Sequence, residues 1–452
     1  MTLTTTLSAR LGRLRNALRD SPPLLWSFLY FFCLLSGYYV LRPVREAMAA
    51  SADAQVVFPP AMIGYFAERG LDIASFTLQV LFTGTFLIML LLQPVYGALV
   101  SRYPRRVFLP VVYVFFIATL LVFHLLFDSG LPGRGMLFFL WIAVFNLFAV
   151  AVFWSFMADV YSTAEARAYY GYIGAAGTVG AICGPILTRT LVERIGIADL
   201  MLVAATLLSL CVVCLLRLRR WAQAREEARG ELDGEKPMGG EVLAGLKLIA
   251  REPLLRWMAA VLVMGVGVGT LLYNEQVALV RRFYPDPREA TAYFANIDLA
   301  INALTLFVQL FITRWLLSRF GIAPALLIPA GAVFLGYAAL AASPLPLLLA
   351  AVQVMTRSGE FCLHKPARES VYTQVAREWR YKAGAAIDTV IYRGADLSFV
   401  WIHKLLAGFG STAVFGAGML VSLGFGACGF MVWREQRKLP PRRASELPPP
   451  AA

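Results

Sequence analysis

The feature that most constrains this chain is a series of long apolar runs, each long enough to cross a lipid bilayer. A transmembrane helix needs about 20 mostly apolar residues to span a hydrocarbon layer about 30 Å thick. Hydrophobic residues make up 59% of the 452 residues and charged residues only 15%, which is more apolar surface than a soluble core can bury. Disordered, collagen-like and disulfide-framework proteins are excluded, and the unbroken runs exclude a barrel of alternating strands. We therefore expect an all-α polytopic membrane protein.

The apolar runs predict about twelve transmembrane helices. They lie at 24–45, 76–100, 107–127, 136–158, 169–192, 199–216, 254–277, 292–317, 322–342, 344–364, 384–408 and 411–433. Only a short stretch around Ser343 and Pro344 separates the ninth run from the tenth, so their fusion would lower the count by one. A signal peptide cleaved near Ala49 is the competing interpretation of the first run, but three charged residues at 42–46 precede that site.

The basic residues indicate an orientation. Lys and Arg accumulate in short cytoplasmic loops, and with the N-terminus inside they favour the cytoplasmic stretches by about three to one. We therefore expect a multi-pass protein of the bacterial inner (plasma) membrane with both termini in the cytoplasm. The net charge of +13 follows from this topology, because the basic residues are scattered over many loops. That scatter argues against a nucleic-acid partner.

A polar stretch after the sixth run divides the chain into two halves. We expect a cytoplasmic segment at 1–23, a six-helix bundle at 24–216, a cytoplasmic linker at 217–253, a second six-helix bundle at 254–433 and a disordered cytoplasmic tail at 434–452. Two similarities between the halves suggest a pseudo-symmetric repeat: Leu24-Leu25-Trp26 with Leu254-Leu255-Arg256, and Leu99–Tyr103 with Leu316–Phe320. Transporters built from such repeats bind their substrate near the membrane midplane.

A glycine and basic residues surround the end of the second run, at Gly97, Arg102, Arg105 and Arg106. This pattern resembles the loop motif between the second and third helices of major facilitator superfamily transporters. Ser101 stands where that family normally carries an acid. The alternative interpretation is a basic anchor for anionic lipid headgroups.

Ionisable residues inside apolar runs are costly in lipid and usually face a cavity. The candidates are Arg42, Arg45, Glu46, Glu275, Asp298, Glu360, Asp388, Arg393 and Asp396. Asp388, Arg393 and Asp396 fall near one face of a single helix. An interhelical hydrogen bond would equally explain Asp298, and a snorkelling position at the interface would explain Arg42 and Arg45.

Several other residue patterns indicate packing or exclude chemistry. Small residues at helical spacing suggest close helix packing, at Gly171, Gly174, Gly177, Gly180 and Gly184. The three histidines are too widely separated for a metal site, and no phosphate-binding motif of an ATPase is present. We therefore expect no cofactor, no metal and no enzymatic activity, and transport driven by exchange or by an ion gradient.

Three segments resemble the nucleotide transporter family, the ATP:ADP translocase group of plastids and intracellular bacteria, which has a major-facilitator-like fold. They are Gly37–Glu46, Trp154–Gly184 and, most specifically, Phe361–Arg393. The resemblance implies exchange of a nucleotide or similar phosphorylated anion by alternating access, with basic residues binding the phosphates. It also implies that the family's basic position in the first helix falls on Arg45, its acid in the seventh on Glu275 and its acid after the fourth on Asp159.

The chain departs from the family at two positions. Asp396 and Gly384 stand where the family carries lysines, and an unpaired charge at a phosphate site could cost several kcal/mol. These departures favour a less charged substrate.

We predict a secondary active transporter of a nucleotide or other organic anion, working as a monomer in the bilayer. Its expected substrate-binding residues are Arg42, Arg45, Glu275, Asp388, Arg393 and Asp396, the arginines meeting the anion and the acids pairing them or taking a proton. Possible gating or coupling residues are Asp159, Asp298, Glu360, Lys365, Arg368, Glu369 and Lys382. The alternative is a proton-coupled symporter or exporter of a different, less charged substrate. A third class is a non-transporting membrane sensor or partner, which an appended cytoplasmic domain would mark.

Overall fold

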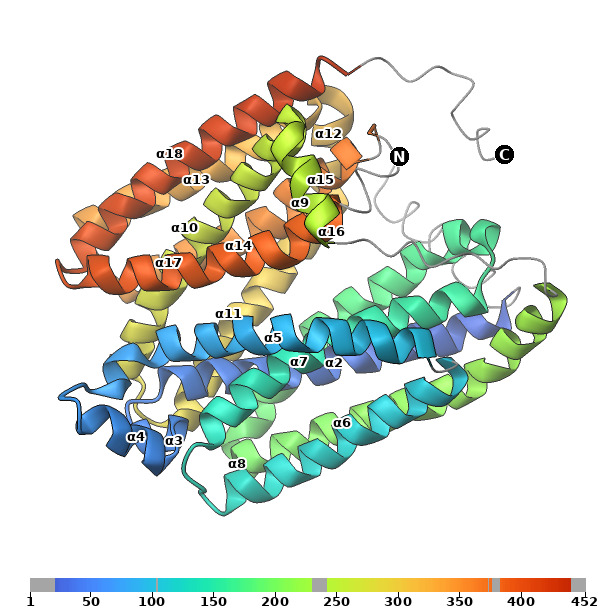
Figure 1. The fold of residues 1–452 in the computed structure, drawn as a ribbon, viewed down its shortest axis with the longest axis horizontal. Coiled ribbons are helices and arrows are strands. Elements are labelled where there is room, and N and C mark those ends of the chain that lie inside the picture. The colour runs from blue at the N-terminus through green and yellow to red at the C-terminus, as the bar shows by residue number, and fades with distance from the viewer. Residues whose placement is uncertain (1–20, 103–104, 230–241, 373, 376–382, 440–452) are drawn as a thin grey trace. The chain divides into compact units, whose positions relative to one another are not determined.

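The structure is a computed structural model that describes residues 21–102, 105–229, 242–372, 374–375 and 383–439 (Figure 1). Within these ranges every regular element is a helix. The all-α fold class predicted from the apolar runs is confirmed. The helices group into two compact units, which are described separately below.

The first unit contains residues 1–236 and 280–302. Its helices are α2 (Pro22–Ala50), α3 (Ala54–Val57), α4 (Pro60–Ala67), η1 (Ile73–Phe76), α5 (Thr77–Arg102), α6 (Arg105–Asp128), α7 (Arg134–Val160) and α8 (Thr163–Arg229). Helix α2 packs against α7 and α8, and α6 lies alongside α8 (Figure 1). Helix α8 changes direction at Gly196, whose φ of 83° is a left-handed conformation that favours glycine.

The second unit contains residues 237–279 and 303–452. Helices α10 (Pro253–Phe283) and α11 (Pro287–Val308) each have residues in both units. The remaining elements are α9 (Val242–Arg251), η3 (Gln309–Thr313), α12 (Arg314–Phe320), α13 (Ile322–Ala342), α14 (Pro346–Gly359), η4 (Glu360–His364), α15 (Lys365–Tyr372), α16 (Gly384–Ala386), η6 (Ile387–Ile391), α17 (Tyr392–Ala407) and α18 (Ser411–Gln436). Helices α13 and α18 lie side by side, and Tyr337 of α13 donates a 2.5 Å hydrogen bond to the Val268 carbonyl of α10.

In the described part of the chain, 9 helical segments are long and apolar enough to cross a membrane. One of them, 168–224 on α8, contains the predicted fifth and sixth runs with the bend at Gly196 between them. The predicted tenth and eleventh runs fall on α14–α15 and α16–α17, where π-helical turns and charged residues interrupt the apolar sequence. The ninth and tenth runs do not fuse, because α13 ends at Ala342 and α14 begins at Pro346.

Much of the polar linker predicted at 217–253 is helical. Helix α8 continues through 217–229, and α9 forms over Val242–Arg251. Ala, Arg and Glu dominate 222–229, and these residues have high helix propensity. Residues 230–241 lie outside the described residues.

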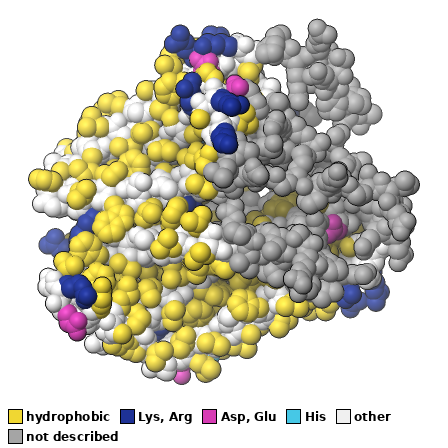
Figure 2. Space-filling model, viewed as in Figure 1, with side chains coloured by type: hydrophobic (Ala, Val, Ile, Leu, Met, Phe, Trp, Pro, Cys, Tyr) yellow, Lys and Arg dark blue, Asp and Glu magenta, His cyan; other side chains and the backbone are white. Residues whose placement is uncertain are grey.

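The surface of the described helices is strongly apolar. Hydrophobic side chains cover much of the visible described face, and Lys and Arg lie near its margins (Figure 2). Large aliphatic side chains are exposed, for example Leu91 at 71% and Leu405 at 72%. Apolar outward faces of this kind suit contact with lipid chains. A helix tolerates that environment because its backbone polar groups are hydrogen-bonded internally.

Small residues on α8 bring its backbone against α2. A Cβ atom added at Gly180 would lie 2.5 Å from the Phe32 carbonyl oxygen, and one added at Gly184 would lie 2.6 Å from Cβ of Tyr39. Gly177 also faces α2, whereas Gly171 and Gly174 face open space. The predicted packing role is therefore confirmed for Gly177, Gly180 and Gly184, and this close approach fixes the position of α2.

Candidate functional site

The first charged cluster lies in the first unit, near the C-terminal end of α2. Arg42 Nη1 donates a 2.7 Å hydrogen bond to Asp298 Oδ1 of α11, and Nε of Arg42 lies 3.9 Å from Glu46 Oε1 one turn along α2. Arg45 donates to the same Glu46 oxygen. The four side chains form a chain of alternating charges that is largely removed from solvent, with 17% of Arg42 and 5% of Asp298 exposed.

Two interhelical hydrogen bonds hold the helices that carry this cluster. Thr188 Oγ1 of α8 donates to the Val40 carbonyl at 3.0 Å, next to the close contacts of Gly180 and Gly184. Asn302 Nδ2 of α11 donates to the Ala181 carbonyl at 2.8 Å. Because Asp298 lies one helical turn before Asn302, the same face of α11 carries both residues.

Arg45 is held on two sides. Its guanidinium lies 4.9 Å from the centroid of the Phe139 ring of α7, within the range of a cation–π contact. Its other contact is with the Glu46 carboxylate. The two arginines and the two acids of this cluster balance in formal charge.

Arg281 of α10 stabilises the same end of α2 and was not singled out from the sequence. Its guanidinium donates to the carbonyls of Ala74, Ala49 and Ala50, at 3.1, 3.2 and 3.4 Å. The bonds to Ala49 and Ala50 satisfy carbonyls that the end of α2 leaves without an intrahelical partner, and the bond to Ala74 connects η1 to the same arginine. The only sequence signal was the Arg281-Arg282 pair at the end of an apolar run.

The second unit contains a buried acid–histidine pair. Glu275 of α10 and His403 of α17 are 9% and 8% exposed, and Glu275 Oε1 lies 2.9 Å from His403 Nε2. The sequence predicted Glu275 as a site residue but considered His403 only as a metal ligand. The sequence feature that could have marked His403 is its position two turns after Asp396 on the same predicted helix.

Asp396 and Arg393 lie about two and three turns before His403 on α17. Asp396 Oδ1 accepts a 2.7 Å hydrogen bond from Thr270 Oγ1 of α10, and Asp396 Oδ2 lies 3.9 Å from Arg393 Nη1. Asp396 therefore partly neutralises Arg393, whose side chain is 33% exposed. Asp396 stands at the position where the resemblance implies a lysine, and its carboxylate is held by the Thr270 hydroxyl.

Two further ion pairs lie around α14, α15 and η6. Asp388 accepts a 2.8 Å bond from Nη2 of Arg368, and Arg357 lies 3.5 Å from Glu360. Arg368 is only 7% exposed, and its Nε and Nη1 have no hydrogen-bond partner among the described residues. A buried guanidinium with two unused donors can bind an anion.

The remaining predicted residues fall outside these clusters. Lys365 and Glu369 are exposed on α15, and Asp159 is half-buried at the end of α7. Lys382 lies outside the described residues, as do the side chains of the basic motif Gly97, Arg102, Arg105 and Arg106. Among the residues that the structure describes, no group of His, Cys, Asp and Glu could hold a metal ion.

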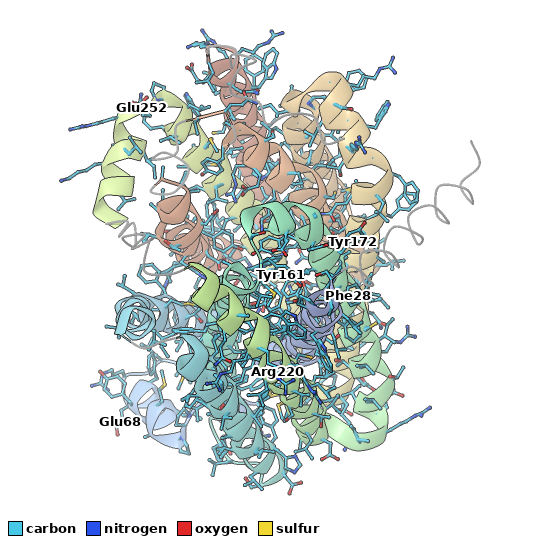
Figure 3. The ribbon with its side chains drawn as sticks, turned by 90° about the vertical axis from the view of Figure 1, so that its right-hand side faces the viewer. Phe28, Glu68, Tyr161, Tyr172, Arg220 and Glu252 are labelled. Carbon is cyan, nitrogen blue, oxygen red and sulfur yellow. The ribbon has the colours of Figure 1, made fainter. Side chains whose placement is uncertain are left out.

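Aromatic residues surround the connection between α7 and α8. Tyr161, labelled in Figure 3, shares a 2.9 Å hydrogen bond with Ser27 of α2, and its ring lies near those of Tyr169 and Tyr170. Burial raises the pKa of the Tyr161 phenol well above its ordinary value. The phenol therefore stays protonated at physiological pH and ties the start of α2 to this connection.

The long apolar helices, with charged groups held among them, are typical of a multi-pass membrane protein. The sequence profile of the Major Facilitator Superfamily matches residues 47–395, which is most of the chain. The chain belongs to this superfamily.

Comparison with individual proteins agrees with this assignment. The chain is 23% identical over 459 aligned positions to ADP,ATP carrier protein 1 of Chlamydia trachomatis serovar D, covering 86% of this chain and 84% of the relative. Among solved structures, a POT family transporter in complex with a thioalcohol-conjugated peptide gives a TM-score of 0.61 at 12% identity, covering 92% of this chain and 96% of that one. The inward-open xylose transporter XylE from E. coli gives 0.57 at 14% identity, covering 94% and 97%. The fold and the predicted similarity to ADP,ATP carriers are thereby confirmed.

Proposed function

We propose that this protein is a secondary transporter that exchanges a nucleotide or a related organic anion across the bacterial inner membrane by alternating access. The observation that carries the proposal is the pair Arg42 and Arg45, held by Glu46 and Asp298 in a largely buried cluster. An ion pair that an anion can replace offers a binding site when substrate is present and charge balance when it is absent. The similarity to a protein named as an ADP,ATP carrier supports a nucleotide as the first candidate.

The second unit supplies further residues to this proposal. Arg393 would contact the anion, and Glu275, Asp388 and Asp396 would hold the basic and polar groups in place between transport steps. The proposed arrangement is a monomer with six-helix bundles at 24–216 and 254–433 and both termini in the cytoplasm. Transporters with repeated halves bind substrate near the midplane, where such charges would otherwise be costly.

A proton-coupled carrier of a less charged substrate is the second candidate. It is favoured by Asp396, a carboxylate bonded to Thr270 where the resemblance implies a lysine, and by the buried Glu275–His403 pair. A carboxylate beside Arg393 opposes the binding of a highly charged anion. Dissipating the pH gradient would abolish accumulation by such a carrier and leave exchange intact.

A binding measurement tests the proposal. The purified protein would be heated with ATP, ADP, inorganic phosphate or an uncharged nucleoside, because a ligand that binds only the folded state raises the unfolding temperature. We expect the anions to stabilise the wild type and Arg434→Gln, whose side chain is exposed on α18, but not Arg45→Gln. Equal stabilisation of both variants would contradict the placement of the anion at Arg45.

A further inference from the structure

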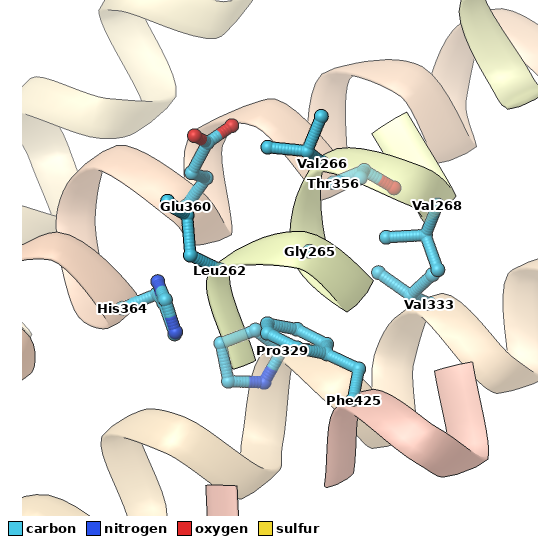
Figure 4. A pocket seen from close by; sticks show the side chains of 10 residues that line it. All are labelled: Leu262, Gly265, Val266, Val268, Pro329, Val333, Thr356, Glu360, His364 and Phe425. Atoms are coloured by element: carbon cyan, nitrogen blue, oxygen red, sulfur yellow. The ribbon is translucent and has the colours of Figure 1, made fainter. Parts of the chain in front are cut away.

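The second unit encloses a small pocket between α10, α13, α14, η4 and α18, shown in Figure 4. Its volume is about 20 Å³, which is enough for one water molecule. Apolar side chains form most of its lining, among them Leu262, Val266 and Phe425. This pocket is too small for an organic ligand.

A much larger pocket lies in the first unit, where several helices end. Its volume is about 330 Å³, within the range of pockets that hold small molecules. Helix α6 contributes its last residues, α7 its first residue, α8 the segment around the bend at Gly196, and α11 its start and the residue before it. Met48 of α2 completes the lining, and all the lining residues belong to the first unit.

The pocket lies at the depth of the lipid headgroups. Among the described segments that are long and apolar enough to span a membrane, Leu109–Asp128 ends at the pocket, and Arg134–Val160 and Pro287–Phe320 begin at it. A spanning helix leaves the hydrocarbon layer near its ends, where the polar interface begins. A ligand of this pocket is therefore a molecule of the membrane surface.

Charged side chains of both signs line this pocket without pairing with one another. The acids are Asp128, Asp199 and Asp286, and the bases are Arg134 and Arg288. Among the described residues, no ion pair joins either arginine to any of these three acids. Charges of both signs are therefore available to a ligand that itself carries both signs.

Arg134 and Asp199 are half-buried and are held by neighbouring groups. Arg134 Nη1 donates hydrogen bonds to the carbonyls of Gly130 and Leu131 at 2.7 and 3.0 Å. An arginine has five N–H donors, so Nη2 and Nε of Arg134 can still bind an anion. Asp199 Oδ1 lies 3.6 Å from His124 Nδ1, which orients the carboxylate.

Arg288 lies against the bend of α8. A Cβ atom added at Gly196 would lie 3.6 Å from Arg288 Nη2, so the guanidinium is close to the backbone at this bend. The backbone N–H of Arg288 donates a 2.8 Å hydrogen bond to Asp286 Oδ1, which fixes the start of α11. The arginine is thereby held at the wall of the pocket while its side chain remains exposed.

An apolar edge adjoins these charged groups. Phe127, Ile195 and Ile197 line the pocket, and Ile195 is 38% exposed. Leu125, about one turn before Asp128 on α6, is 65% exposed. Because these side chains lie near the ends of spanning helices, they can contact the acyl chains of a lipid whose headgroup occupies the pocket.

We propose that this pocket binds the headgroup of a phospholipid that carries both a phosphate and a primary ammonium, namely phosphatidylethanolamine. Arg134 and Arg288 donate hydrogen bonds to the phosphate, and the carboxylates of Asp128, Asp199 and Asp286 accept hydrogen bonds from the ammonium. The acyl chains leave the pocket along the apolar edge.

The charges of the pocket distinguish this lipid from others at the interface. The trimethylammonium of phosphatidylcholine has no N–H to donate to the carboxylates. Phosphatidylglycerol has no cation, and the pocket's acids outnumber its arginines and oppose a purely anionic headgroup. Free O-phosphoethanolamine has the same charged groups as the lipid but lacks the acyl chains, so it cannot contact the apolar edge.

Native mass spectrometry measures this preference directly. The purified full-length protein in detergent would be titrated with dioleoyl phosphatidylethanolamine, phosphatidylcholine or phosphatidylglycerol, and the dissociation constant of the first bound lipid determined from peak intensities. We expect phosphatidylethanolamine to bind at least about threefold more tightly than either other lipid, a factor typical of a partly exposed pair of charges.

Two variants test the two signs of charge separately. Asp128→Asn should weaken the binding of phosphatidylethanolamine and leave that of phosphatidylglycerol unchanged or tighter, whereas Arg288→Gln should weaken both. The matched controls are Glu289→Gln and Arg194→Gln, exposed charges near the same helix ends that do not line the pocket, and they should keep the wild-type preference. Asp199→Asn repeats the test of an acid if Asp128→Asn does not fold.

The outcomes are distinct. Equal binding of the three lipids, a preference for phosphatidylglycerol, or the same preference in the pocket variants as in the wild type would overturn the proposal. Free O-phosphoethanolamine, added to protein without lipid, should bind more weakly than the lipid, and binding as tight as that of the lipid would assign the pocket to a soluble zwitterion instead. These measurements require no transport, so their result is independent of the proposed function.

Discussion

The pair Arg42–Asp298 should couple α2 to α11 energetically, and substituting Asp298 by Asn tests this. At 2.7 Å, with an effective dielectric of about 20, the gross attraction is about 6 kcal/mol, before desolvation is subtracted. Removing one member of a buried pair commonly costs about 3–5 kcal/mol, but Glu46 remains 3.9 Å from Arg42 and compensates part of the loss. We therefore expect Asp298→Asn to lower the free energy of unfolding by about 2 kcal/mol, or about 30-fold in the folding equilibrium.

A double-mutant cycle isolates this interaction. Arg42→Gln, Asp298→Asn and the double variant would be unfolded in mixed detergent micelles and followed by tryptophan fluorescence. The predicted coupling free energy is about 2 kcal/mol, since the two residues share one contact. The matched control is Lys438–Glu435, a pair of similar length, at 2.6 Å, with 60% of the lysine exposed, which should couple by less than about 0.5 kcal/mol. A coupling for Arg42–Asp298 as small as that of the control would refute the reasoning.

Three further predictions concern packing and pairing. Gly180→Ala should lower the unfolding temperature and the yield of folded protein, because the added Cβ atom would lie 2.5 Å from an α2 carbonyl oxygen. Gly174 faces open space, so Gly174→Ala should be neutral or stabilising in the same thermal assay. Arg281→Lys should increase proteolysis near the end of α2, since one ammonium cannot satisfy three carbonyls in the same geometry; an unchanged cleavage rate would contradict this. His403→Gln should destabilise the protein by leaving the Glu275 carboxylate buried, and adding Glu275→Gln should restore part of the loss, so additive losses would argue against the pair.

The sequence predicted the helices well because membrane helices depend on local composition. A run of about 20 apolar residues has few alternatives in lipid, since its backbone must be hydrogen-bonded internally. The break between α13 and α14 was predictable from Ser343 and Pro344. The division of α8 was predictable too, because the non-helical backbone at Gly196 separates two helical parts at the gap between the fifth and sixth apolar runs.

Pairings between distant residues were harder to predict. Hydropathy marks Arg42 and Asp298 as unusual, but their contact joins residues 256 positions apart and depends on how α2 and α11 pack. His403 has no special sequence context until Glu275 is placed beside it.

Exchange transport is the central claim, and uptake of labelled ATP by proteoliposomes tests it most directly. Vesicles containing the purified protein would be preloaded with ADP or left empty, and Arg45→Gln would be measured beside Arg434→Gln. The account predicts that internal ADP stimulates uptake by the wild type and by Arg434→Gln, and that Arg45→Gln loses this stimulation. Uptake that is absent in both kinds of vesicle, or equal in Arg45→Gln and the wild type, would contradict nucleotide exchange through the cluster on α2.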